Sequence, residues 1–205
     1  MFPRLFSVTL FLALLLAVST TLAAKTDNPA MSALKQAQGN LEQGKAMEAY
    51  KATDRAMFYL WDQVPFTLGV AVLTKGPNEG YGLFTPRQGN VYHEGQTLYV
   101  YLEPMGQRIK RIRDGLFAFS LSMDVALLKP DGTILWGKDK FQEWKFTSRR
   151  PNREFFINLR LKLRNVPDGQ YLLSLRVHDR LSGRIAGRQL KVAFKKGAAT
   201  GASKP

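Results

Sequence analysis

The chain contains no cysteine among its 205 residues, and its only histidines are His93 and His178. The lack of cysteine excludes disulfide bonds, thiolate metal ligands, lipidation at a cysteine and a cysteine nucleophile. The two histidines lack the spacing of metal ligands, and a serine–histidine–aspartate set needs groups that converge. We therefore predict that the protein is not an enzyme, with no cofactor and no metal. We expect His178 to lie on the surface beside an acceptor, and Asp179 to hold the turn at Leu181–Gly183 through backbone N–H groups.

Acidic residues are also few. The sequence has 16 aspartates and glutamates against 30 lysines and arginines, and its formal net charge is +14. Such a balance favours anionic partners, namely nucleic acid, anionic glycans or lipid headgroups. The alternative is that the charge only keeps the protein soluble.

The N-terminus has the features of an export signal. Arg4 precedes the almost wholly apolar stretch Leu5–Val18, and small residues follow as far as Ala24. The apolar stretch is shorter than the ~20 residues that span a bilayer. We predict a signal peptide over residues 1–24, cleaved near Ala23 or Ala24, and a periplasmic or secreted protein. A retained N-terminal anchor is the alternative, and export argues against a nucleic-acid partner.

Residues 25–64 predict a helical hairpin. Asn28 and Pro29 suit the N-cap and first position of a helix, while Gly44 and Pro65 suit the ends of two helices. We expect the hairpin to pack on the domain that follows it, through Tyr50, Met57, Leu60 and Trp61.

Residues 65–196 predict eight or nine short strands. The clearest is Phe155–Arg164, in which aliphatic residues alternate with polar and basic ones: Ile157, Leu159, Leu161 and Leu163 against Asn158, Arg160, Lys162 and Arg164. Pro-Asp-Gly turns at 130–132 and 167–169 punctuate the pattern. The fold class we predict is mainly β, an antiparallel immunoglobulin-like β-sandwich preceded by the helical hairpin. The tail, residues 197–205, is expected to be disordered.

Two stretches resemble known families. Gly44, Ala49 and Ala56 are spaced as in the second half of a tetratricopeptide repeat, where small residues let two helices approach closely. The segment from Pro167 to Phe194 resembles the closing hairpin of immunoglobulin-like and fibronectin-III-like modules of bacterial exported proteins. The whole chain resembles uncharacterised bacterial exported proteins that join a helical hairpin to such a sandwich. This resemblance implies a fold and no particular activity.

Three basic elements are the candidate binding residues. The first is the outward face of the strand, Arg160, Lys162 and Arg164, which Arg176 joins if Tyr171–Asp179 pairs with this strand. The second is a loop carrying Arg108, Lys110, Arg111 and Arg113, and the third is the basic loop Arg149–Arg153. We predict a non-catalytic binding module whose guanidinium groups contact anionic glycans or lipid headgroups of the cell envelope. A solvated face that discourages aggregation is the alternative.

A rival hypothesis is a protein–protein adaptor, in which the helical hairpin docks an envelope protein. This hypothesis requires an exposed apolar patch on the hairpin. The tyrosines Tyr99 and Tyr101 offer weaker support for ligand binding, since they can either face outward and stack on sugar rings or pack internally.

Overall fold

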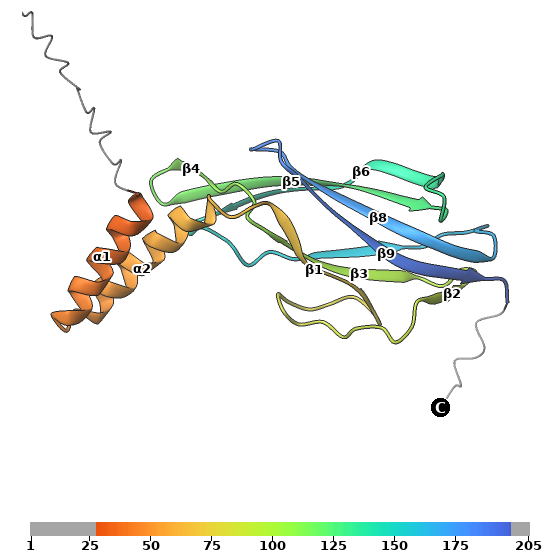
Figure 1. The fold of residues 1–205 in the computed structure, drawn as a ribbon, viewed down its shortest axis with the longest axis horizontal. Coiled ribbons are helices and arrows are strands. Elements are labelled where there is room, and N and C mark those ends of the chain that lie inside the picture. The colour runs from red at the N-terminus through yellow and green to blue at the C-terminus, as the bar shows by residue number, and fades with distance from the viewer. Residues whose placement is uncertain (1–27, 198–205) are drawn as a thin grey trace, which may run out of the picture.

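The computed structural model describes residues 28–197, so the predicted signal peptide and almost all of the predicted tail lie outside the described residues. The protein is mainly β, with two helices before the strands (Figure 1). The elements are α1 Pro29–Glu42, α2 Ala46–Trp61, β1 Thr67–Thr74, β2 Val91–His93, β3 Leu98–Met105, β4 Lys110–Arg113, β5 Leu116–Leu128, β6 Ile134–Ser148, β7 Ile157–Leu161, β8 Gly169–Asp179 and β9 Ile185–Lys195.

The two helices pair through alanines. Asn28 caps α1 by accepting a hydrogen bond from the N–H of Ala30 at 3.0 Å, and Pro29 is the first helical residue. Five alanines of these helices are buried, Ala30, Ala33, Ala49, Ala52 and Ala56. Small side chains allow a close approach of the helices, so the larger apolar residues lie elsewhere on their surfaces. No helix within residues 28–197 is both long and apolar enough to cross a membrane.

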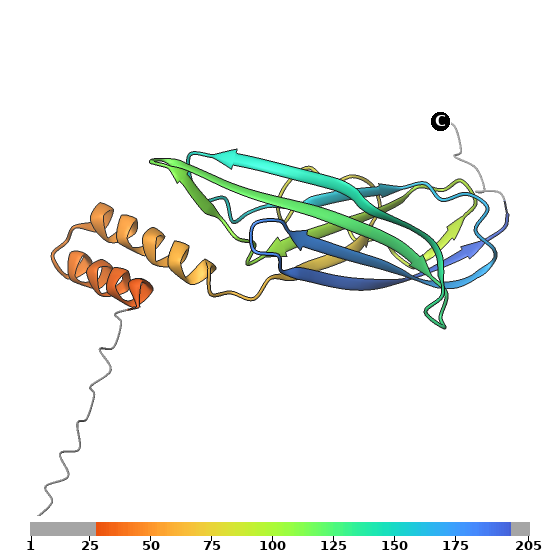
Figure 2. The ribbon, with the colours of Figure 1, turned by 90° about the horizontal axis from the view of Figure 1, so that it is seen from above.

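The hairpin projects beyond one end of the sheets and does not lie on a sheet face (Figures 1 and 2). The expected packing through Tyr50, Met57 and Leu60 is therefore wrong, since these side chains are 63%, 47% and 39% exposed. Trp61 alone behaves as expected, because its Nε1 donates to the carbonyl of Gln107 at 2.9 Å. The alanine face of each helix packs against the other helix. The linker after α2 places the hairpin beyond the end of the sheets.

The strands form two sheets around one hydrophobic core. The smaller sheet has the order β1-β3-β7, and the larger has β2-β9-β8-β5-β4, with β6 also paired to β5. All these pairs are antiparallel except β2 with β9, which is parallel. Val100 and Leu159 from the smaller sheet and Leu121 and Leu175 from the larger are at most 1% exposed and share the core. Their burial supplies the main stabilising free energy of the fold.

One predicted strand pairing is wrong. β7 and β8 do not pair, because β7 lies beside β3 while β8 lies between β5 and β9. The segment between them crosses from one sheet to the other, with Asn165 at a φ of 55°. The hydroxyl of Tyr171 donates to the carbonyl of Pro167 at 2.9 Å and fixes the corner where the chain enters β8.

A long loop covers the outer face of the smaller sheet. Tyr101 points outward from β3 but is fully buried, because Phe84 stacks on it with ring centroids 4.5 Å apart. Its hydroxyl donates to Glu103 at 2.5 Å and accepts from the N–H of Gly82 at 2.7 Å. Burial and the Glu103 carboxylate raise the pKa of Tyr101 to about 12. Tyr101 therefore packs internally and offers no platform for a sugar ring.

Gly106 is where the linker after α2 meets the end of β3. Its φ is 77°, and a Cβ there would lie 2.6 Å from the carbonyl oxygen of Pro65 and 2.8 Å from that of Val64. Gly115 has a similar φ of 64° but open space around it. We predict that Gly106→Ala lowers the free energy of unfolding by about 3 kcal/mol or more, and Gly115→Ala by about 1 kcal/mol. Urea titrations of both variants measure the difference, and equal losses would contradict the close approach at Gly106.

Candidate anion-binding site

The alternation predicted for the strand around Leu159 is present. Ile157, Leu159 and Leu161 are at most 2% exposed, while Arg160 faces outward. Lys162 and Arg164 are exposed too, although they lie beyond the end of β7. Arg160 stands opposite Tyr99 of β3 in the smaller sheet.

Arg176 does not join this face. It lies on β8 in the larger sheet, where its registered partner is Asp124 of β5. The combined face of Arg160, Lys162, Arg164 and Arg176 therefore does not form, because its premise was a β7–β8 pair. The predicted sheet face is reduced to one arginine on a strand and two basic residues after it.

The two basic loops, in contrast, come together. Residues 110–113 form β4, which pairs with the start of β5, and they are a strand where the sequence predicted a loop. Arg149 and Arg150 directly follow β6, whose end also pairs with the start of β5. Both segments thus reach the end of the larger sheet at which α2 approaches the strands (Figure 1).

A hollow of about 230 Å³ lies where these segments meet α2. Four arginines line it, Arg55 from α2, Arg111 from β4, and Arg149 and Arg150 after β6. Aromatic rings form its apolar side: Phe58 and Phe117 meet edge to face at 5.6 Å, and the Arg111 guanidinium lies 5.3 Å from the Phe117 centroid. The site therefore combines several donors of N–H hydrogen bonds with apolar surface.

The one carboxylate that lines this hollow, that of Asp54, already forms an ion pair. Asp54 accepts from Arg153 at 2.9 Å, and this ion pair ties α2 to the segment after β6. Arg108 pairs in the same way with Asp62 at the end of α2. Over residues 28–197, the four arginines of the hollow make no ion pair, and only Arg55 has a side-chain hydrogen bond, to Gln36 at 2.8 Å. Their charge is thus available to a ligand.

The sequence predicted some residues of the hollow and missed others. Arg108 and Arg111 belong to the predicted set, and the structure gives them different roles, Arg108 in an ion pair and Arg111 in the hollow. Lys110 and Arg113 are exposed on β4 outside the lining of the hollow. Arg149 and Arg150 were recognised only as a basic loop. Arg55 was missed, because one arginine on a helix carries no signal without its spatial neighbours.

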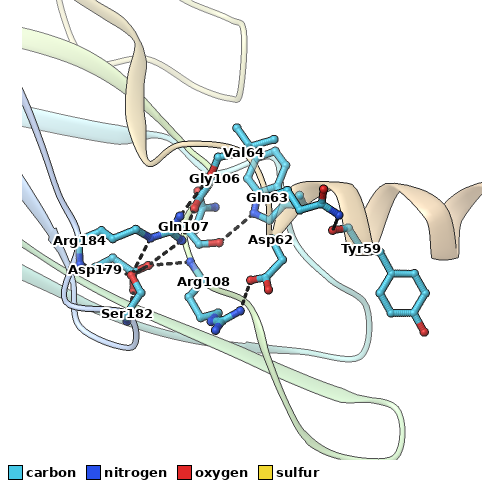
Figure 3. A network of polar contacts seen from close by, with 11 residues as sticks. Tyr59, Asp62, Gln63, Val64, Gly106, Gln107, Arg108, Asp179, Ser182 and Arg184 are labelled. Atoms are coloured by element: carbon cyan, nitrogen blue, oxygen red, sulfur yellow. Dashed lines mark hydrogen bonds and ion pairs between the residues drawn. The ribbon is translucent and has the colours of Figure 1, made fainter. Parts of the chain in front are cut away.

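A buried carboxylate holds the neighbouring segments in place (Figure 3). Asp179 is 1% exposed and accepts from the N–H of Leu181 at 3.0 Å and of Arg108 at 2.7 Å. Arg184 lies 3.6 Å from it and donates to the carbonyls of Gly106, at 2.7 Å, and Val64, at 3.2 Å. Asp179 holds the turn as predicted, and in addition it connects that turn to the segment before β4 and, through Arg184, to the linker after α2.

His178 lies on the outer face of the larger sheet beside an acceptor, as expected. Its Nε2 is 2.6 Å from Asp124, which also accepts from the N–H of Lys140 at 2.9 Å. In the part of the chain that the structure describes, no three histidine, aspartate or glutamate residues are grouped so as to hold a metal ion.

No protein-family model and no curated protein matches the sequence. Solved structures show distant likeness. The PKD domain of an M14-like peptidase from Thermoplasmatales archaeon SCGC AB-540-F20 has 10% identity and a TM-score of 0.36, over 65% of this chain and 98% of that one. The CARDB domain of the PF1109 protein from Pyrococcus furiosus has 14% identity and a TM-score of 0.30, over 64% and 93%. An endo-beta-1,4-mannanase from Thermotoga petrophila has 12% identity and a TM-score of 0.36, over 73% and 24%. Likeness at this level supports no statement about activity.

Replacing Asp179 tests its role at the junction. Asp179→Asn keeps the size of the side chain but removes the charge that faces Arg184. We expect a loss of about 2 to 3 kcal/mol in the free energy of unfolding, measured by urea titration. The matched control is Asp168→Asn, an exposed aspartate that accepts from the N–H of Lys196 at 2.7 Å and should cost under about 1 kcal/mol. Equal losses in the two variants would contradict the role of Asp179.

The surroundings of the Asp124 carboxyl group should make the stability of the fold depend on pH. Burial alone would raise the pKa of Asp124, but the Lys140 N–H, His178 and Arg176 outweigh it and hold the pKa below its usual value. A lowered pKa in the folded state means that the carboxylate stabilises the fold above its unfolded pKa of ~3.9, and that this contribution is lost as the pH falls through the folded value. We expect Asp124→Asn to be less stable than the wild type at pH 7, with the difference shrinking towards pH 3. A difference that is constant with pH in urea titrations would contradict this.

Proposed function

We propose that this protein is an exported, non-catalytic binding module that holds anionic groups of the cell envelope in the arginine hollow at the junction of α2 and the larger sheet. The observation that carries the proposal is the meeting of Arg55, Arg111, Arg149 and Arg150 from three separate segments around one hollow. Like charges repel, so four guanidinium groups in one place are stabilised when an anion lies between them.

The chemistry of the hollow favours phosphate, sulfate or carboxylate groups. A guanidinium donates two parallel hydrogen bonds to such a group, and this geometry is why arginine is common where anions are recognised. The rings of Phe58, Tyr59 and Phe117 beside the arginines would accept the apolar part of a sugar or lipid headgroup. A larger hollow of about 560 Å³ over β5 and β6 is less suited to an anion, because Glu143 lies among its basic residues.

The proposal also includes the finer fold and the location. Two sheets around one core, with a tyrosine hydroxyl bonded to a carbonyl four residues earlier, are features of immunoglobulin-like sandwiches, and Tyr171 with Pro167 supplies such a corner. Export rests on the sequence of residues 1–24. Envelope glycans and anionic lipid surfaces share the same anionic groups, so the test below includes both.

A triple variant tests the hollow. We expect Arg111→Gln, Arg149→Gln and Arg150→Gln together to weaken binding to heparin, and to vesicles containing phosphatidylglycerol, by tenfold or more. Binding of the wild type should weaken steeply between about 50 and 300 mM salt, because exposed charges are screened. Fluorescence anisotropy measures the first interaction, and vesicle sedimentation measures the second. If the variant loses binding to only one of these probes, that probe tells whether the anion belongs to a glycan or to a lipid surface.

The matched control removes the same charge from the predicted strand face, in Arg160→Gln, Lys162→Gln and Arg164→Gln. We expect this control to lose at most about threefold in affinity, since only the net charge changes. Equal losses in the two triple variants would mean that net charge alone attracts the anion. Binding that does not depend on salt, or no binding to either probe, would contradict the proposal.

Docking of a partner on the helical hairpin is a second candidate function. The specific observation that favours it is the exposed apolar surface of α1 and α2, where no element of residues 28–197 covers the large side chains.

A further inference from the structure

The helical hairpin exposes eight large apolar side chains, and seven of them lie outside the arginine hollow that Tyr59 lines. Because alanines fill the contact between α1 and α2, these seven residues remain outside it with 39% to 66% of their surface exposed. They are Met31, Leu34 and Leu41 of α1, and Met47, Tyr50, Met57 and Leu60 of α2. Contiguous exposed apolar surface of this extent is characteristic of an interaction site.

All of these seven side chains except Met47 share one side of the hairpin. Arg55 of α2 donates to Gln36 of α1 at 2.8 Å, so these two residues mark the same side of the hairpin. With 100° between successive residues, Leu34 and Leu41 fall on the opposite flank of α1 from Gln36. In α2, Tyr50 and Met57 likewise fall opposite Arg55. The hairpin therefore has one polar flank and one apolar flank.

The apolar flank has the spacing of a helical bundle. Small and apolar residues recur at alternating intervals of three and four, at Leu34, Ala37 and Leu41 in α1 and at Ala46, Tyr50, Thr53, Met57 and Leu60 in α2. This heptad spacing suits helices that pack nearly parallel or antiparallel to one another in a four-helix bundle. A two-helix unit with such a flank lacks the other half of the bundle.

Charge indicates what covers the flank. Residues 28–64 carry four basic side chains, Lys35, Lys45, Lys51 and Arg55, and four acidic ones, Glu42, Glu48, Asp54 and Asp62. The hairpin is thus formally neutral, whereas residues 65–197 have 23 basic and 11 acidic residues. A neutral hairpin has no electrostatic attraction to an anionic surface and no net repulsion from another hairpin.

We infer that the occupant is the hairpin of a second copy of this chain, packed flank to flank about a twofold axis as a four-helix bundle. The exposed part of the six side chains on this flank amounts to on the order of 600 Å² per hairpin, comparable with the ~800 Å² per partner of stable interfaces. A twofold axis brings the same patch of each copy together, and an apolar flank is complementary to itself. This inference rests on the second candidate function and is independent of the anion site.

The test is the mass of the full chain in solution. We expect sedimentation velocity at about 20 µM to give twice the monomer mass. The double variant Tyr50→Glu, Met57→Glu should be a monomer at that concentration. Its dimer dissociation constant should be at least tenfold higher than that of the wild type. Raising the salt from about 50 to 500 mM should maintain or strengthen the dimer, because apolar contact persists while repulsion between two basic copies is screened. Anion binding has the opposite dependence, so failure of one proposal is distinguishable from failure of the other.

The matched control is Ser32→Glu, Gln36→Glu, which adds the same charge on the polar flank of α1. It should stay dimeric, and the circular dichroism of both double variants should show unchanged helix content. A wild type that is monomeric up to about 200 µM would overturn the inference. So would association that persists in Tyr50→Glu, Met57→Glu or is lost equally in the control. Flotation of a wild-type monomer with neutral vesicles would also overturn it, since a lipid surface would then be the occupant.

Discussion

The arrangement of this protein depends on the buried carboxylate of Asp179. A charge that is removed from water is costly unless hydrogen bonds satisfy it, and here backbone N–H groups, a serine hydroxyl and Arg184 do so. Through these bonds one side chain connects the β8–β9 turn, the approach to β4 and, by way of Arg184, the linker after α2. This connection contributes to the direction in which the hairpin leaves the sheets, and with it to the position of Arg55 opposite the sheet arginines.

Charge and apolar surface are segregated along the chain. The hairpin is neutral and exposes methionine, leucine and tyrosine side chains, while the excess of positive charge lies among the strands. The two proposed interactions should therefore respond to salt in opposite directions, since screening would weaken anion binding and relieve repulsion between copies. The two proposals would reinforce each other: a dimer joined through its hairpins would carry two arginine hollows, and a polymer that reached both would bind more tightly than it would to two separate molecules.

Local patterns predicted the elements, whereas contacts between distant segments decided the site. The alternation around Leu159 and the alanines Ala49 and Ala56 could be interpreted from spacing alone, because each pattern determines one face of one element. The alternation does not determine which strand pairs with which. Leu159 and Leu175 alternate in the same way, yet they lie in different sheets, and the crossing between them separated Arg160 from Arg176. The meeting of Arg111 with Arg149 likewise depends on both segments pairing with the start of β5.

The hairpin is attached by polar contacts and by one aromatic contact outside the core, Phe58 with Phe117, and this links its orientation to the proposed ligand binding. Trp61 bonds the carbonyl of Gln107, Arg108 pairs with Asp62, and Arg153 pairs with Asp54. Exposed ion pairs of this kind contribute at most about 1 kcal/mol each, so few interactions hold the hairpin in its direction. An anion held by Arg55 of α2 and by Arg149 beyond β6 would add a contact across the same junction. By linkage, an anion that bound both ends of the hollow would stabilise this hairpin direction by the same free energy by which the direction favoured anion binding.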